Sequence, residues 1–104
     1  MEENELVLAV IDVESGFDRV AISRSGAFGY MKIMPFWLAK IGRPGDNLFQ
    51  TRTNLRMGCT ILRYYLDMEH GNYVHALARY DDSYGKVNFP YSVLMLLNKR
   101  WSPS

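Results

Sequence analysis

The chain has 104 residues, of which 48% are hydrophobic, and this length and composition predict one globular domain, residues 1–104, with a substantial core. Twelve lysines and arginines nearly balance eleven aspartates and glutamates, so the net charge of +1 argues against nucleic acid as a partner. The single cysteine, Cys59, excludes an intramolecular disulfide, and helical spacing predicts that it is a small core residue rather than a nucleophile.

The first residues show neither a signal peptide nor a membrane span. They lack a basic n-region, and Asp12 and Glu14 interrupt the apolar run. If the protein acts outside the cytoplasm, we expect either a domain excised from a longer exported chain or an export signal that lies elsewhere.

The first predicted element is an amphipathic helix that ends near Gly16. Its apolar stripe contains positions 6, 7, 10, 11 and 17, and one acidic residue, Glu14, shares that stripe in the last turn. A glycine is typical of the position that follows a helix.

The sequence of residues 18–53 predicts loops with little helix. Serines and glycines in residues 18–29 indicate a structured loop, and the stretch YMKIM, residues 30–34, is expected to be a short helix that Pro35 ends or bends. Residues 36–53 are predicted to be a surface connection with some helix before Gly42.

Three more helices complete the predicted fold. Residues 54–70 form the strongest helical pattern, with Thr53 available as N-cap and Gly71 as the stop. Residues 73–80 predict a shorter helix, and Pro90 suits the first turn of a closing helix. Because no stretch alternates with period two, we expect an all-α domain of about five to six helices.

The acidic residue in the first helix suggests a chemical role. A carboxyl group in apolar surroundings is disfavoured in its charged form, so its pKa rises and it can hold a proton near neutral pH, as a general acid must. A solvated charge at the end of a helix is the simpler alternative for Glu14.

Four stretches resemble, in order and spacing, the lysozyme-like catalytic domain of soluble-type lytic transglycosylases, which is related to goose-type lysozyme. They are ESGF, AISRSGAFGYMKIMP, NLRMGCTILRYYL and ALARYDDSYGK. The resemblance implies a compact lysozyme-like fold and cleavage of the β-1,4 bond between N-acetylmuramic acid and N-acetylglucosamine in peptidoglycan without water. Glu14 would act as acid and then as base, and a 1,6-anhydro ring would form.

The same resemblance implies the surroundings of the reaction. It implies action in the periplasm or cell envelope, delivery by a larger envelope or secretion-associated protein, and no cofactor. Conventional glycosidases need two carboxylates, whereas this family relies on one.

The resemblance also implies substrate-binding residues. Ser23 and Met34 match groove residues, and Tyr80 matches a tyrosine whose phenol points at the catalytic glutamate; a loop hydroxyl, a core methionine and a packed aromatic are the structural alternatives. Lys32 and Asp81 stand where the family has glutamine and asparagine. We expect them to pair with each other across the groove.

Other functions remain as alternatives. Asp81 or Asp82 would supply the second carboxylate of a lysozyme-type hydrolase. A catalytically impaired peptidoglycan-binding module and a purely structural helical domain are two further possibilities. His70 and His75 are isolated in the sequence and predicted to lie on the surface, so no metal site is expected.

Overall fold

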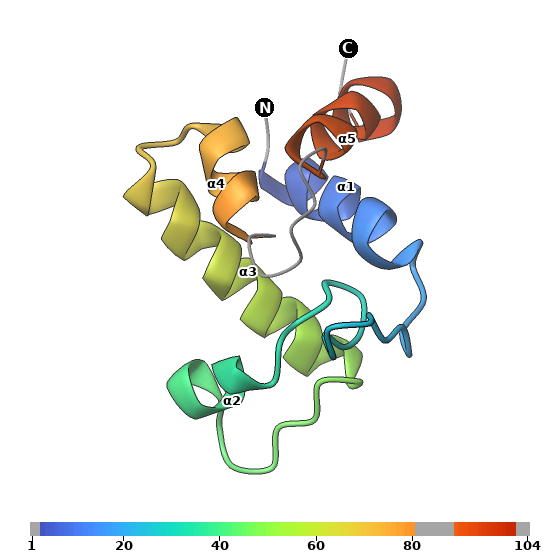
Figure 1. Cartoon of the computed structure of the whole chain (residues 1–104), viewed down its shortest axis with the longest axis vertical. Coiled ribbons are helices and arrows are strands. Elements are labelled where there is room, and N and C mark those ends of the chain that lie inside the picture. Colours follow the sequence, from blue (N-terminus) through green and yellow to red (C-terminus); the bar gives the residue numbers. More distant parts are fainter. Residues whose placement is uncertain (1–2, 81–88, 102–104) are drawn as a thin grey trace.

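The structure, a computed structural model, describes residues 3–80 and 89–101. Within these ranges the chain forms five α-helices and one π-helical segment, and no strand (Figure 1). The elements are α1 (Glu3–Ser15), α2 (Phe36–Ile41), α3 (Thr51–Met68), α4 (Tyr73–Tyr80), α5 (Phe89–Leu96) and η2 (Leu97–Trp101). The predicted all-α fold is confirmed, and no described helix has the length and apolar character that a membrane span requires.

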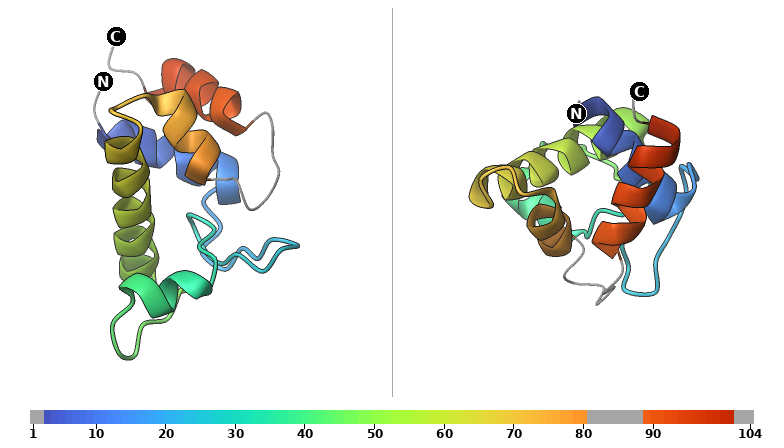
Figure 2. Two further views of the ribbon diagram at one scale, coloured as in Figure 1. Left: turned by 60° about the vertical axis from the view of Figure 1, so that its left-hand side comes forward. Right: turned by 90° about the horizontal axis from the view of Figure 1, so that it is seen from above.

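The helices gather around the two ends of α3. Figure 2 shows α1, α4 and α5 near its C-terminal half, while α2 and the loops that join α1 to α3 lie near its N-terminal half. α1 packs mainly against α5 and η2, and α4 packs against both α3 and α5. Because these helices each bury one apolar face, a single core forms between them.

The first helix forms and ends as its sequence predicts. Leu6 and Val10 are fully buried on its apolar face, and the Gly16 N–H bonds to the Asp12 carbonyl at 3.0 Å to close the last turn. Gly16 and Phe17 both have left-handed backbone angles, with φ of 59° and 64°. The apolar stripe therefore stops at Glu14, and Phe17 is exposed instead of continuing it.

The long helix α3 corrects two details of the prediction. It begins at Thr51, with Gln50 in the N-cap position, so Thr53 is not the N-cap but a buried residue of the first turn. Cys59 is exposed, because the buried face of α3 runs through Met57 and Ile61 instead.

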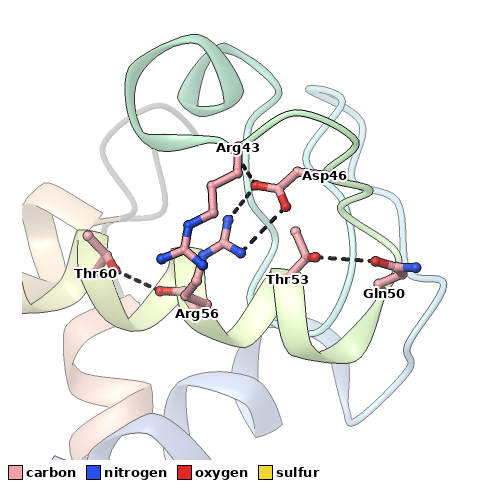
Figure 3. A network of polar contacts seen from close by, with 6 residues as sticks. All are labelled: Arg43, Asp46, Gln50, Thr53, Arg56 and Thr60. Atoms are coloured by element: carbon pink, nitrogen blue, oxygen red, sulfur yellow. Dashed lines mark hydrogen bonds and ion pairs between the residues drawn. The ribbon is translucent and has the colours of Figure 1, made fainter.

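A polar network ties the connection before α3 to the helix (Figure 3). Asp46 accepts the Arg43 backbone N–H at 2.7 Å and forms an ion pair with Arg56, while the Thr60 hydroxyl donates to the Arg56 carbonyl at 2.8 Å. The hydrogen bond from Arg56, then that from the Arg43 backbone, lowers the pKa of Asp46 below 3.8, its ordinary value.

The short helix expected at residues 30–34 does not form. Phe28 and Ile33 exchange two backbone hydrogen bonds of 2.9 Å around a turn, in which Gly29 and Lys32 have φ of 82° and 51°. These left-handed angles are incompatible with a right-handed helix. Pro35 takes the N-cap position of α2 rather than ending a helix. The predicted helix at 73–80 and the place of Pro90 in the first turn of α5 are confirmed.

Candidate active site

Glu14 is a buried acidic residue at the end of α1. Its exposed fraction is 4%, and Val10 and Ile11, one turn earlier on the same face, are 0% and 5% exposed. The helical period brings the carboxyl group to this apolar face, and the backbone reverses two residues later at Gly16. The chain therefore combines a desolvated carboxyl group with a helix terminus at which other segments can approach.

The turn at residues 28–33 is held by a buried amide of α3. Asn54 is 1% exposed; its Oδ1 accepts the Met31 N–H at 2.9 Å, and its Nδ2 donates to the carbonyls of Phe28 and Leu48 at 2.8 Å each. One side chain thus bonds to three backbone groups from two different loops, and two of these bonds are buried. This explains how a segment without regular secondary structure can lie inside the core.

Two glycines allow this close approach. A Cβ atom at Gly29 would meet the Asn54 side chain and would lie 2.8 Å from the Leu48 carbonyl oxygen. A Cβ atom at Gly58 would meet the Met31 sulfur. The loop and α3 therefore fit together only because both positions lack a side chain.

Tyr80 joins the same turn from α4. It is 8% exposed, and its hydroxyl donates to the Met31 carbonyl at 2.8 Å. The Met31 N–H is bonded to Asn54, so the backbone of this one residue is bonded to both α3 and α4. Since Lys32 follows directly, the structure brings Tyr80 to the turn that carries Lys32.

The other predicted site residues have separate surroundings. Ser23 is half-buried, and its Oγ accepts the Ala27 N–H at 2.9 Å, which closes a tight turn in the loop. Met34 is half-buried immediately before α2. Asp81 lies outside the described residues, as does Asp82, so the expected pairing of Lys32 with Asp81 stays a prediction.

Tyr80 also lines a cleft of about 630 Å³ between α2, α3 and α4. The other lining residues are aromatic on α2 and α3 and largely charged near α4: Phe36, Trp37, Tyr65, Glu69, His75, Ala78 and Arg79. The rings of Phe36 and Trp37 have centroids 5.0 Å apart, so two neighbouring aromatic side chains line this side of the cleft. The cleft offers apolar faces and polar groups together, as small-molecule and sugar sites do.

An ion pair between Glu69, directly after α3, and α4 supplies the charged side of this cleft. Glu69 pairs with Arg79, and the His75 Nδ1 lies 3.5 Å from a Glu69 oxygen. The hydrogen bond from Arg79 lowers the pKa of Glu69 below 4.5, its ordinary value. His70 and His75 are both exposed, as predicted. Among the described residues no group of three or more His, Cys, Asp or Glu side chains could hold a metal ion.

Asn54 is the residue of this region that sequence reasoning missed. It is a polar side chain on the buried face of an amphipathic helix, as Glu14 is, and the same signal would have identified it. Its partners could not have been identified in this way, because Met31 and Phe28 lie 23 and 26 residues away in the sequence.

Solved structures with the same arrangement of helices are known. The 70 kDa soluble lytic transglycosylase SLT70 from Escherichia coli matches with a TM-score of 0.69 and 23% sequence identity, over 93% of this chain and 17% of that one. The 70 kDa soluble lytic transglycosylase in complex with bulgecin A matches with a TM-score of 0.67 and 23% identity, over 92% of this chain and 16% of that one. The chain therefore spans about one sixth of the length of these proteins and shares the fold of that part.

A family model gives the assignment that structural likeness at this identity does not. The model of the transglycosylase SLT domain matches residues 1–92, which is most of the chain and includes both Glu14 and Tyr80. The chain belongs to the transglycosylase SLT domain family.

Proposed function

We propose that this domain is a lytic transglycosylase that cleaves the β-1,4 bond between N-acetylmuramic acid and N-acetylglucosamine in peptidoglycan. The observation that carries the proposal is the burial of Glu14, 4% exposed, at the end of α1 in a chain of this family. A carboxyl group removed from water keeps a proton more readily than a solvated one, which suits a general acid.

The proposed mechanism uses Glu14 twice. Its carboxyl group protonates the glycosidic oxygen of the leaving sugar, and the C–O bond breaks. The resulting carboxylate then takes the proton from the 6-hydroxyl of the N-acetylmuramic acid residue as that oxygen bonds to C1. The product carries a 1,6-anhydro ring, no water is consumed, and Glu14 regains its proton.

The remaining site residues are proposed to hold the glycan strand. The Tyr80 hydroxyl donates a hydrogen bond to the Met31 carbonyl, which fixes the phenol beside the turn that carries Lys32 and precedes Met34. The Ser23 Oγ accepts a backbone N–H and keeps its own proton to donate. Met34 would contribute an apolar contact, and Lys32 and Asp81 are proposed to pair beside the substrate.

The setting of the reaction follows from this proposal. Peptidoglycan is the partner, so the domain acts in the periplasm or cell envelope. The chain covers 17% of SLT70, and we propose that residues 1–104 form one domain that works within a larger envelope or secretion-associated protein.

Mass spectrometry of the soluble products of purified peptidoglycan tests this function. Wild type should release muropeptides lighter by one water than hydrolysis products, and Glu14→Gln, which keeps the shape but cannot donate or accept the proton, should release none. Glu5→Gln is the matched control, because it makes the same chemical change on the same helix.

Each other outcome contradicts the proposal in a different way. Hydrated reducing ends would indicate a hydrolase and direct attention to Asp81 or Asp82. Binding to peptidoglycan without any product from wild type would indicate a binding module, and the absence of both would indicate a structural domain.

A further inference from the structure

The charges of this chain are separated along its sequence. Residues 19–66 contain eight lysines and arginines and one acidic residue, Asp46. Residues 1–18 contain six acidic residues and no lysine or arginine, and residues 67–104 contain four charges of each sign. The net charge of +1 therefore conceals a strongly basic middle segment.

Most of the basic segment lies toward one end of the molecule. Residues 19–50 surround the N-terminal half of α3 in Figures 1 and 2, whereas the acidic helix α1 packs against α5 and η2 near the other end. Separation along the sequence is therefore partly a separation in space, although Asp12, Glu14 and Asp18 lie where α1 meets the basic segment. A charged polymer would be attracted to one end and repelled from the other.

Much of this positive charge is not neutralised within the protein. Asp46, the acidic residue of the segment, pairs with Arg56, and Arg63 pairs with Asp67 of α3. Five other cations are exposed and form no ion pair with a side chain in the part of the chain that the structure describes: Arg19, Arg24, Lys40, Arg43 and Arg52. Arg19 donates a hydrogen bond to the Phe49 carbonyl, and the charge of Arg43 acts on Asp46, whose pKa it helps Arg56 to lower. We call the other three residues, Arg24, Lys40 and Arg52, the basic surface.

We propose that the basic surface binds the carboxylate groups of the peptide side chains on peptidoglycan, an inference that rests on the proposed function. Ser23, Lys32 and Met34, which are proposed to hold the glycan, belong to the same segment of the chain. A strand that reaches them lies next to the segment that carries these cations, and at physiological salt an exposed charge acts over about 8 Å, one Debye length. This continuity favours peptidoglycan over nucleic acid or anionic lipid, which carry charge of the same sign.

The basic surface is proposed to strengthen binding to peptidoglycan, so binding is measured with a protein that should not cleave it. Glu14→Gln protein is sedimented with insoluble peptidoglycan over a series of salt concentrations, with and without Arg24→Glu or Arg52→Glu. Lys99→Glu is the matched control, because Lys99 is exposed on η2, outside the basic surface, and the charge changes equally. Arg52 lies in the first turn of α3, where an acidic residue is favourable, so its replacement should not impair folding.

We expect each substitution on the basic surface to weaken binding about three- to fivefold at low salt, as reversal of one exposed charge should. The effect should disappear at high salt and with peptidoglycan whose carboxylates have been converted to amides. Lys99→Glu should bind like the parent protein.

Several results would overturn or support the inference independently of the reaction. Equal binding by all variants, or equal binding to amidated peptidoglycan, overturns it. So does binding to duplex DNA or phosphatidylglycerol vesicles that depends on Arg24 and Arg52 when peptidoglycan binding does not. If wild type gives no anhydro products but binding follows the predicted pattern, the proposed function fails and the basic surface stands.

Discussion

Helix α1 and the turn at residues 28–33 are both buried, but they are stabilised by different interactions. α1 satisfies its backbone within itself and packs an apolar face containing Leu6 and Val10. The turn has no regular secondary structure and depends on two side chains from elsewhere, Asn54 and Tyr80. The sequence of α1 therefore specifies its helical conformation, whereas the conformation of the turn depends on contacts with residues far along the chain.

The largest effect expected from this contrast is that of Asn54→Ala. The Met31 N–H and the Leu48 carbonyl would lose their partner at about 1–3 kcal/mol each, whereas the Phe28 carbonyl keeps its bond from the Ile33 N–H. We therefore expect the free energy of unfolding to fall by about 4 kcal/mol. Urea unfolding measures this change. Asn47→Ala is the control, because Asn47 also bonds to a backbone N–H, that of Phe49, but is exposed. Equal losses in the two variants would show that the buried amide has no special role.

The next largest effect is the difference in stability between alanine substitutions at two glycines that have the same backbone angle. Gly29 and Gly45 both have φ of 82°, but a Cβ atom at Gly45 would meet nothing within 4 Å, whereas one at Gly29 would meet Asn54 and Leu48. Alanine at either position incurs the same backbone strain, so the difference isolates the steric conflict. We expect Gly29→Ala to be less stable than Gly45→Ala by about 2 kcal/mol in urea unfolding. Equal stability would mean that the loop and α3 can move apart without cost.

A smaller effect is expected for Tyr80→Phe. This change leaves the buried Met31 carbonyl without its donor, and we expect a loss of about 1.5 kcal/mol in thermal or urea unfolding. In combination with Asn54→Ala the losses should not add, because both side chains hold the backbone of Met31. Strict additivity would show that the two contacts stabilise the protein independently.

The smallest effect concerns the partly buried ion pair of Asp46 with Arg56. Arg56 lowers the pKa of Asp46 in the folded state below 3.8, its ordinary value. The unfolded chain therefore binds the proton more readily, and the contribution to stability is present above pH 3.8 and is lost as the pH falls through the folded-state pKa. Urea unfolding between pH 2 and 6 should show a shallower acid loss for Asp46→Asn than for wild type. Parallel curves would contradict this coupling.

The sequence predicts correctly those parts of the fold whose conformation depends on neighbouring residues in the chain. The helical period identified α1, α4 and most of α3, and an acidic residue in an apolar stripe predicted that Glu14 would be buried. The turn at residues 28–33 was taken for a helix, because its geometry follows from left-handed angles and from a bond to Asn54 far along the chain.

In the candidate site, too, the sequence predicts some residues but not their contacts with residues far along the chain. Tyr80 was identified through the resemblance, but its bond to Met31 joins residues 49 apart, which no local pattern shows. Cys59 was placed in the core because the apolar face of α3 was rotated in the prediction by about one position. An error of that size moves a small side chain from the inside to the outside of a helix that is 18 residues long.

The packing of α1 against α5 and η2 has a consequence for the order of folding. During synthesis α1 leaves the ribosome before the other helices described, yet its main partners lie at residues 89–101. Contacts between sequence-distant segments form late, since closing the intervening loop costs entropy. The helix that carries Glu14 should therefore be among the last parts to become protected from hydrogen exchange, and the carboxyl group should be buried only when nearly the whole chain has assembled.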